Sequence, residues 1–296
     1  MLSCHVIEIV TPKKFVLNGL WFGPPKPKRV IIWAHGLTSS AFSMLHVVEQ
    51  LVGKGTAVLT FNNRGFGTIN SIKRRVGKRS KSIVAGAAHE VFTECEDDIQ
   101  GAVNFARKRG GKKIYVAGHS TGCQKAVYWA HTKKGGRGVR GLILLAPVSD
   151  YADVLKHVEK GKLTQLVKLA RTLVKKGRPH QLIVEGVKAP WGGFFLCDAQ
   201  RFLSLYTPDS RETMFSYEQP KKDPRIFKSV QVPMLVLWAG KDEYADRPAK
   251  KIVAWFEKST RTRLKAIIVP KVGHSFRGAE KQVARAIRGW IAKIQT

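Results

Sequence analysis

Residues 112–130 read KKIYVAGHSTGCQKAVYWA, and they predict a strand, a sharp turn and a helix in immediate succession. The apolar run Ile114–Ala117 has the character of a buried strand, and Thr121–His131 has helical spacing. The turn between them matches the pattern GxSxG, which presents a serine hydroxyl at a strained strand-to-helix junction. Glycines flank the serine because strand and helix approach closely there. We therefore predict Ser120 as a nucleophile; the alternative is that it only caps the helix.

Outward from this stretch, short apolar runs alternate with helical segments. Such alternation is typical of an α/β fold, a mostly parallel central sheet flanked by helices, and runs that are apolar throughout suit strands covered on both faces. The other predicted core strands are Val30–Ala34, Ala57–Phe61, Leu142–Leu145, Met234–Trp238 and Lys265–Val269, preceded by Val6–Val10 and Lys14–Trp21. The other predicted helices of the core are Phe42–Lys54, Glu90–Lys108, Ala249–Lys258 and Glu280–Ile294.

Residues 151–230 interrupt this alternation. They have helical character, most clearly in Lys160–Lys176, and contain no convincing buried strand. An insertion between two core strands is where a lid over an active site is built. We therefore predict one domain over residues 1–296, with a helical cap inserted at residues 151–230.

A serine hydroxyl needs a base to become a nucleophile, and an acid must orient that base. His274 lies in a loop after the last predicted strand, where it can reach the carboxyl edge of the sheet. Asp242 directly follows the preceding core strand. Its neighbours Glu243 and Asp246 are alternatives, and Asp150 is the fallback. We predict that His274 is the base and that Asp242 orients it.

The developing oxyanion of acyl transfer needs two backbone N–H donors. Thr121, the residue after the nucleophile, supplies one in this kind of turn. The loop after the first core strand contains His35-Gly36-Leu37-Thr38, and Gly36 lets the backbone turn inward there. We therefore predict the N–H groups of Leu37 and Thr121 as the oxyanion hole.

Basic residues greatly outnumber acidic ones: Lys and Arg number 52 and Asp and Glu 21, a net charge of +31. They are spread along the whole chain, which favours a general solubility or ionic property over a dedicated binding groove. We therefore expect no nucleic-acid partner. The densest basic group lies in what we predict to be a loop: Lys73, Arg74, Arg75, Lys78, Arg79 and Lys81.

Five acids gather at the start of a predicted helix, where its dipole favours negative charge. They are Glu90, Glu94, Glu96, Asp97 and Asp98. A metal site there is the weaker alternative.

No apolar run approaches the roughly 20 residues that span a bilayer, and the N-terminal stretch lacks the regions of a signal peptide. We therefore expect a cytoplasmic protein with no membrane span. The four cysteines show no metal-ligand spacing and are expected to be reduced thiols. They are Cys4, Cys95, Cys123 and Cys197.

Several motifs together carry a family resemblance: the His-Gly after the first core strand, the elbow GHSTG, GKDE at residues 240–243 and VGH at residues 272–274. The chain resembles the α/β-hydrolase superfamily from about Val6 to Ile294. HGLTSSAFS, LTFNNRGFG, AGAAHEVFTECEDDIQGAVNFA and GHSTGCQKAVYW are similar to a subfamily that includes fungal siderophore-hydrolysing esterases. The resemblance implies a Ser-His-Asp ester hydrolase, carried here by Ser120, His274 and Asp242.

These features predict hydrolysis of a carboxylic ester or related acyl bond in a small molecule, through an acyl-enzyme. The mechanism implies no cofactor or metal, and the sequence does not indicate an oligomeric state. The same triad also serves acyltransferases, thioesterases and peptidases, which stay open as alternatives. From another class, a non-catalytic polyanion-binding protein would use the net charge instead.

Overall fold

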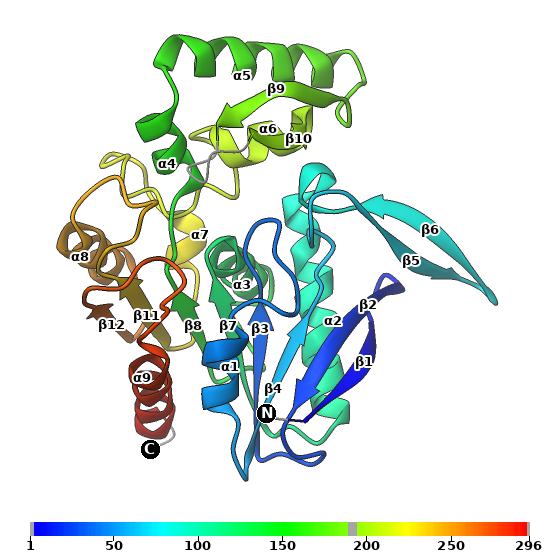
Figure 1. The fold of residues 1–296 in the computed structure, drawn as a ribbon, viewed down its shortest axis with the longest axis vertical. Helices are drawn as coiled ribbons and strands as arrows, with labels where there is room; N and C mark the ends of the chain where they lie inside the picture. Colours follow the sequence, from blue (N-terminus) through cyan, green and yellow to red (C-terminus); the bar gives the residue numbers. More distant parts are fainter. Residues whose placement is uncertain (1–2, 189–193, 295–296) are drawn as a thin grey trace.

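A single ten-stranded sheet forms the centre of the computed structural model, which describes residues 3–188 and 194–294 (Figure 1). Its strands are β1 (Cys4–Val10), β2 (Phe15–Phe22), β3 (Arg29–Ala34), β4 (Thr56–Phe61), β5 (Asn70–Val76), β6 (Arg79–Ala85), β7 (Lys113–His119), β8 (Gly141–Leu145), β11 (Met234–Ala239) and β12 (Leu264–Val269). The order is β12-β11-β8-β7-β3-β4-β2-β5-β6, and β1 pairs with β2. The six strands from β12 to β4 pair in parallel, whereas β1, β2, β5 and β6 pair antiparallel.

The six parallel strands lie within one or two residues of their predicted positions. They are easy to predict because both of their faces are covered: every residue of β8 and β11 is buried. The parallel arrangement also brings the loops at their carboxyl ends to one edge of the sheet, which is where the candidate site lies.

Helices cover both faces of the sheet. One apolar cluster packs α2 (Cys95–Lys108), α3 (Thr121–Thr132) and α8 (Ala249–Ser259) against one face. A second cluster packs α1 (Leu45–Leu51) and α9 (Glu280–Lys293) against the other. The two layers give the sandwich that the alternation of strands and helices predicts, and the expected α/β class is confirmed.

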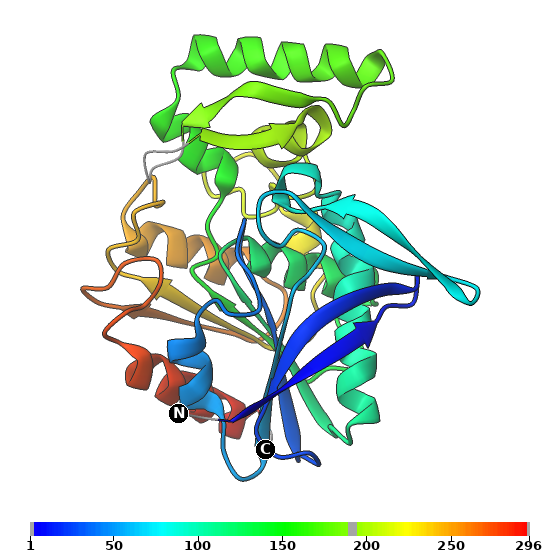
Figure 2. The same cartoon turned by 45° about the vertical axis from the view of Figure 1, so that its right-hand side comes forward.

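Most of the insertion lies beyond the carboxyl ends of the parallel strands, at the top of Figures 1 and 2, whereas residues 214–230 return to the core and join its apolar cluster. Its elements are α4 (Asp150–His157), α5 (Lys160–Lys175), β9 (Leu182–Lys188), β10 (Phe194–Asp198), α6 (Ala199–Tyr206) and α7 (Arg225–Lys228). A separate apolar cluster joins α5 to α6 through residues such as Leu166, Ala170 and Phe202. β9 and β10 form a two-stranded antiparallel sheet, which helical periodicity did not indicate.

Two other segments differ from expectation. The basic group around Lys73–Lys81 is not a loop but the hairpin β5–β6, which projects from the edge of the sheet (Figure 2). Most of its side chains are exposed, so no apolar alternation marked the strands. The acid-rich helix α2 begins at Cys95 rather than Glu90, after two short 3₁₀ turns at Ala87–His89 and Phe92–Glu94. Helix α1 likewise begins late, at Leu45.

Within residues 3–188 and 194–294, no helix combines the length and apolarity needed to cross a membrane. The four cysteines are free; Cys95, Cys123 and Cys197 are buried and Cys4 is exposed.

Candidate active site

Ser120 lies at the junction of β7 and α3 in a strained backbone conformation, with φ 54° and ψ −130°. Its side chain makes no capping hydrogen bond to α3, which disfavours the alternative of a plain helix cap. The flanking glycines are required by sterics. A Cβ at Gly118 would lie 2.3 Å from the carbonyl oxygen of Gly122, and a Cβ at Gly122 would lie 2.2 Å from that of Ala34. The turn is therefore built to hold one serine at the sheet edge.

His274 and Asp242 come together because β11 and β12 are parallel neighbours, which places their carboxyl-end loops side by side. Nδ1 of His274 lies 2.9 Å from Oδ2 of Asp242 and 3.1 Å from Oδ1. The side chain of Asp242 is fully buried. A carboxylate that faces Nδ1 accepts its proton in a hydrogen bond and leaves Nε2 to act as the base.

The other acids considered from the sequence have different partners. Glu243 Oε2 accepts the backbone N–H of His274 at 2.9 Å, and Asp246 pairs with Arg247. Asp150 Oδ2 accepts a hydrogen bond from the Gln124 amide at 3.0 Å. Among the acids proposed for this role, Asp242 is the one that meets the imidazole of His274.

Ser120 and His274 line one cavity of about 640 Å³. Leu37 and Gly36 line it from the loop after β3. Gly36 closely approaches the serine: a Cβ there would lie 2.9 Å from Cβ of Ser120. Thr121 is the first residue of α3 and is buried. The structure thus brings the predicted nucleophile, base and oxyanion residues to the same edge of the sheet.

The loop that carries Leu37 is held by residues that sequence reasoning did not assign a role. His35 Nδ1 donates to the Gly36 carbonyl at 2.8 Å, and its Nε2 accepts the Asn63 backbone N–H at 3.2 Å. This pattern requires a neutral imidazole. Burial, with a contribution from Lys125, lowers the pKa of His35 to about 3 and keeps it neutral. Asn62 Oδ1 accepts the backbone N–H of Ala41 at 2.7 Å and ties down the far end of the loop.

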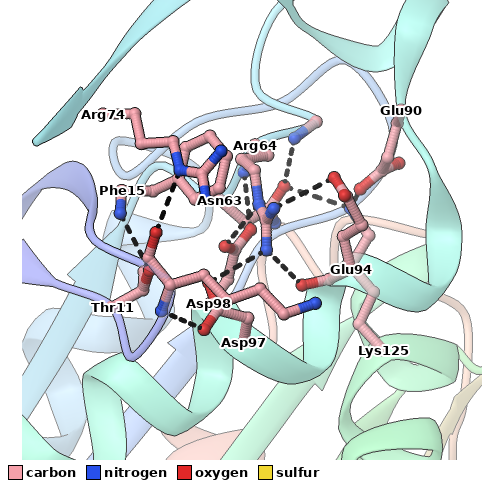
Figure 3. A network of polar contacts seen from close by, with 12 residues as sticks. Thr11, Phe15, Asn63, Arg64, Arg74, Glu90, Glu94, Asp97, Asp98 and Lys125 are labelled. Atoms are coloured by element: carbon pink, nitrogen blue, oxygen red, sulfur yellow. Dashed lines mark hydrogen bonds and ion pairs between the residues drawn. The ribbon is translucent and has the colours of Figure 1, made fainter. Parts of the chain in front are cut away.

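Asn62 and Asn63 belong to the motif Phe61-Asn62-Asn63-Arg64-Gly65 that follows β4, and the arginine of this motif anchors α2 (Figure 3). Its side chain pairs with Asp98 at 2.8 Å, Glu94 at 3.0 Å and Asp97 at 3.2 Å. The guanidinium also lies 4.3 Å from the ring centroid of Phe15. Three of the five clustered acids therefore bind one arginine, an ion-pair role beyond the helix-dipole role we expected.

His119 contacts the candidate base directly. Its Nε2 donates to the His274 carbonyl at 3.0 Å, and the two ring centroids are 4.7 Å apart. Burial and the adjacent His274 lower the pKa of His119 to about 3, which keeps the imidazole neutral. The side chain of His119 therefore holds the loop of the candidate base, and it also lines the cavity of Ser120.

Helix α4, at the start of the insertion, supplies two carboxyl groups to the cavity, Asp150 and Asp153. Burial and the nearby Glu212 raise the pKa of Asp150 to about 8, so its carboxyl group is mainly protonated at neutral pH. Burial raises the pKa of Asp153 to about 6. A protonated carboxyl group is a hydrogen-bond donor and can orient a ligand's carbonyl or hydroxyl oxygen.

Of the described residues, His89, His180 and Asp198 bring three potential metal-ligand atoms together. None of the three lines the cavity of Ser120.

Comparisons with known proteins agree with this architecture. A family model described as "Protein of unknown function (DUF1749)" matches residues 90–291. No curated protein matches the chain in sequence. Among solved structures, the chain is similar to the α/β hydrolase GrgF from Penicillium sp. sh18, with 14% identity, full coverage of both chains and a TM-score of 0.67. A thermostable carboxyl esterase from Bacillus coagulans gives 14% identity, full coverage of both chains and a TM-score of 0.66. Est1E from Butyrivibrio proteoclasticus gives 18% identity, 98% coverage of each chain and a TM-score of 0.61.

At these identities the neighbours establish the fold. The α/β-hydrolase fold, predicted from the motifs, is thereby confirmed.

Proposed function

Because the chain belongs to the DUF1749 family and has the α/β-hydrolase fold, we propose that it is a serine hydrolase that cleaves carboxylic esters or related acyl bonds. The main support for this proposal is the 2.9 Å contact between Nδ1 of His274 and Oδ2 of the buried Asp242. His274 also lines the same cavity as Ser120. An oriented imidazole and a half-buried serine with a strained backbone, both at one cavity, are the parts that acyl transfer needs.

In the proposed reaction, Ser120 Oγ attacks the acyl carbon while His274 Nε2 takes its proton. The tetrahedral oxyanion is bound by the N–H groups of Leu37 and Thr121. In the described part of the chain, no turn or loop hydrogen bond uses either donor. The imidazolium, stabilised by Asp242, returns the proton to the leaving alcohol. Water then attacks the acyl-enzyme by the same proton transfers and releases the acid.

The insertion at residues 151–230 acts in this proposal as a cap within a single domain. Helix α4 contributes Asp150 and Asp153 to the cavity wall, and Tyr206 at the end of α6 adds an aromatic side chain. The cap therefore adds polar and aromatic side chains to a cavity wall whose largest share comes from residues 36–46. One neighbour of the same fold, Est1E, has been solved with ferulic acid bound, which supports a small-molecule acyl substrate.

The test is labelling with a fluorophosphonate, together with turnover of short p-nitrophenyl esters. The wild-type protein should be labelled once per chain at Ser120, and Ser120→Ala should lose both labelling and turnover. Ser39→Ala is the matched control, since Ser39 lines the same cavity without a proposed role. Asp242→Asn should keep the fold and lower kcat by about 10⁴-fold, because the imidazole then adopts the wrong tautomer. Full turnover in the Ser120→Ala variant would refute the proposal.

A further inference from the structure

A cluster of two histidines and one aspartate lies where the insertion meets the core. His89 belongs to the 3₁₀ turn Ala87–His89 of the core, His180 to the loop between α5 and β9, and Asp198 to the end of β10. Nδ1 of His89 lies 3.0 Å from Oδ2 of Asp198, and Nδ1 of His180 lies 2.9 Å from the same oxygen. All three ligand atoms lie within 4.8 Å of one another.

We propose that His89, His180 and Asp198 form a zinc-binding site that ties the insertion to the core. Imidazole nitrogen and carboxylate oxygen are both ordinary zinc ligands. The proposal is independent of the hydrolase chemistry, because none of the three residues lines the cavity of Ser120.

The ligands from the insertion are preorganised by the backbone around them. The N–H of Ala199 donates to the Gln181 carbonyl at 3.0 Å, and the N–H of Gln200 donates to the Pro179 carbonyl at 3.0 Å. These two bonds flank His180 and hold its loop against Asp198. A site that is assembled before the metal binds loses less conformational entropy on binding.

The core side is equally constrained. The N–H of His89 donates to the Gly86 carbonyl at 3.0 Å, and Gly86 has φ 106°, a conformation that glycine adopts easily. Across the boundary, the Gln200 side-chain amide donates to the Glu90 carbonyl at 3.1 Å. The residue after His89 is therefore bonded directly to the helix that follows Asp198.

The arrangement leaves one carboxylate oxygen of Asp198 free to bind zinc and one coordination position of the metal open to solvent. Oδ1 of Asp198 accepts the backbone N–H of Arg201 at 2.8 Å, which leaves Oδ2 for a metal. His180 is 61% exposed, so water can supply a fourth ligand from that side. Tetrahedral bonds of about 2.0–2.1 Å place neighbouring ligand atoms about 3.3–3.4 Å apart. Each imidazole nitrogen therefore needs to move away from Oδ2 of Asp198 by only a few tenths of an ångström.

One cation beside the site is already neutralised by ion pairs. Arg201, whose backbone N–H is bonded to Asp198, is paired with Glu212 at 2.5 Å and with Glu90 at 3.0 Å. The buried carboxylate of Asp198 is thus the charge that a zinc ion meets, and the two imidazoles complete its coordination.

Zinc at this site would act on the cap. Helix α6 begins directly after Asp198 and ends at Tyr206, which lines the cavity of Ser120. Fixing Asp198 to His89 holds the start of this helix on the core, so the metal would restrain the cap against opening.

The experiment uses full-length protein stripped with a chelator and titrated with zinc chloride by calorimetry, with thermal unfolding in parallel. Wild-type protein should bind one zinc per chain and show a higher Tm with zinc. His180→Ala removes a largely exposed side chain, so it should fold normally; it should weaken zinc binding by more than about tenfold and lose the Tm shift. His89→Ala should behave in the same way, and cobalt(II) should give the visible absorption of a four-coordinate site in wild-type protein but in neither of these two variants.

His131→Ala is the matched control, since His131 is an exposed histidine bonded to Ser229 outside the cluster, and it should bind zinc as wild type does. Ser120→Ala should also bind zinc normally, which separates this proposal from the proposed hydrolase activity. Absence of saturable one-to-one binding, or equal affinity in His180→Ala, would overturn the zinc site and leave a hydrogen-bonded His-Asp-His contact.

Discussion

At the scale of residues, the size of Gly36 matters for the proposed chemistry, because this glycine lies where the proposed oxyanion loop meets Ser120. A Cβ at this position would lie 2.9 Å from Ser120 Cβ and 3.4 Å from Ser120 Oγ. Side-chain carbon atoms do not approach this closely without a shift of one partner. The loop would have to move away from the serine, and the N–H of Leu37 would move with it.

We therefore expect Gly36→Ala to lower kcat/KM for p-nitrophenyl esters by about 10²–10³-fold, the usual cost of losing one oxyanion donor. Gly53→Ala is the matched control, since a Cβ there has no atom within 4 Å. Steady-state kinetics and thermal unfolding of both variants make the comparison. Wild-type kcat/KM in Gly36→Ala would show that Leu37 is not a donor.

At the scale of elements, the insertion is joined to the core by a buried ion cluster. Lys125 of α3 lies 2.6 Å from Oε1 of Glu90, and Arg201 of α6 lies 3.0 Å from Oε2 of the same residue. Arg201 also pairs with Glu212 at 2.5 Å. Burial opposes ionisation of Glu90, but Lys125 and Arg201 together lower its pKa. The cluster is stable only as a whole, because each charge lacks water and depends on its partners.

Arg201→Met should consequently destabilise the protein by about 3–5 kcal/mol, since it leaves buried carboxylates without a counter-charge. Chemical denaturation read by tryptophan fluorescence measures the free energy of unfolding. Arg225→Met provides the control: Arg225 is 88% exposed, and its contact with Asp223 is 3.6 Å, so the change should stay within about 0.5 kcal/mol. Equal effects of the two variants would mean that the buried cluster does not hold the insertion.

At the scale of the molecule, one strongly basic groove lies away from the candidate site. A groove of about 920 Å³ at the amino ends of β3 and β7 is lined almost entirely by basic and small residues. Its basic residues are Lys26, Lys28, Arg29, Lys108, Arg109, Lys112 and Lys113. The cavity of Ser120, at the opposite edge of the sheet, has Asp150 and Asp153 in its wall. A polyanion bound in the groove and an ester bound beside Ser120 would therefore occupy separate surfaces.

We expect short duplex DNA to bind weakly and without sequence preference, with an affinity that falls steeply as salt rises. Ester turnover should be unaffected by the same DNA, because the two surfaces are separate. Fluorescence anisotropy and p-nitrophenyl ester kinetics over one salt series test both statements. The double variant Lys26→Glu and Lys112→Glu should flatten the salt dependence of binding and leave kcat/KM unchanged. Strong inhibition of hydrolysis by DNA would contradict this separation.

Much of the fold could be predicted because the signals are local. An apolar run predicts the strand that begins at Met234, and apolar residues spaced 3.6 apart predict the helix that begins at Glu280. Both patterns can be recognised without knowledge of the tertiary structure. The turn at Ser120 is equally local, since its glycines are required by atoms of the same strand, turn and helix or of the adjacent strand. The hairpin β5–β6 escaped prediction because most of its side chains are exposed and carry no apolar alternation.

The sequence by itself was enough to predict which segments form the parallel strands and where the sharp turn at Ser120 lies. It also predicted a short set of residues that could act as base and acid. The tertiary structure decided that Asp242, not Asp150, meets His274, that Asn63 supports His35, and that His89 lies beside Asp198. These partners are 28 to 109 residues apart. Contacts over such separations depend on the order and register of the strands, which local periodicity does not encode.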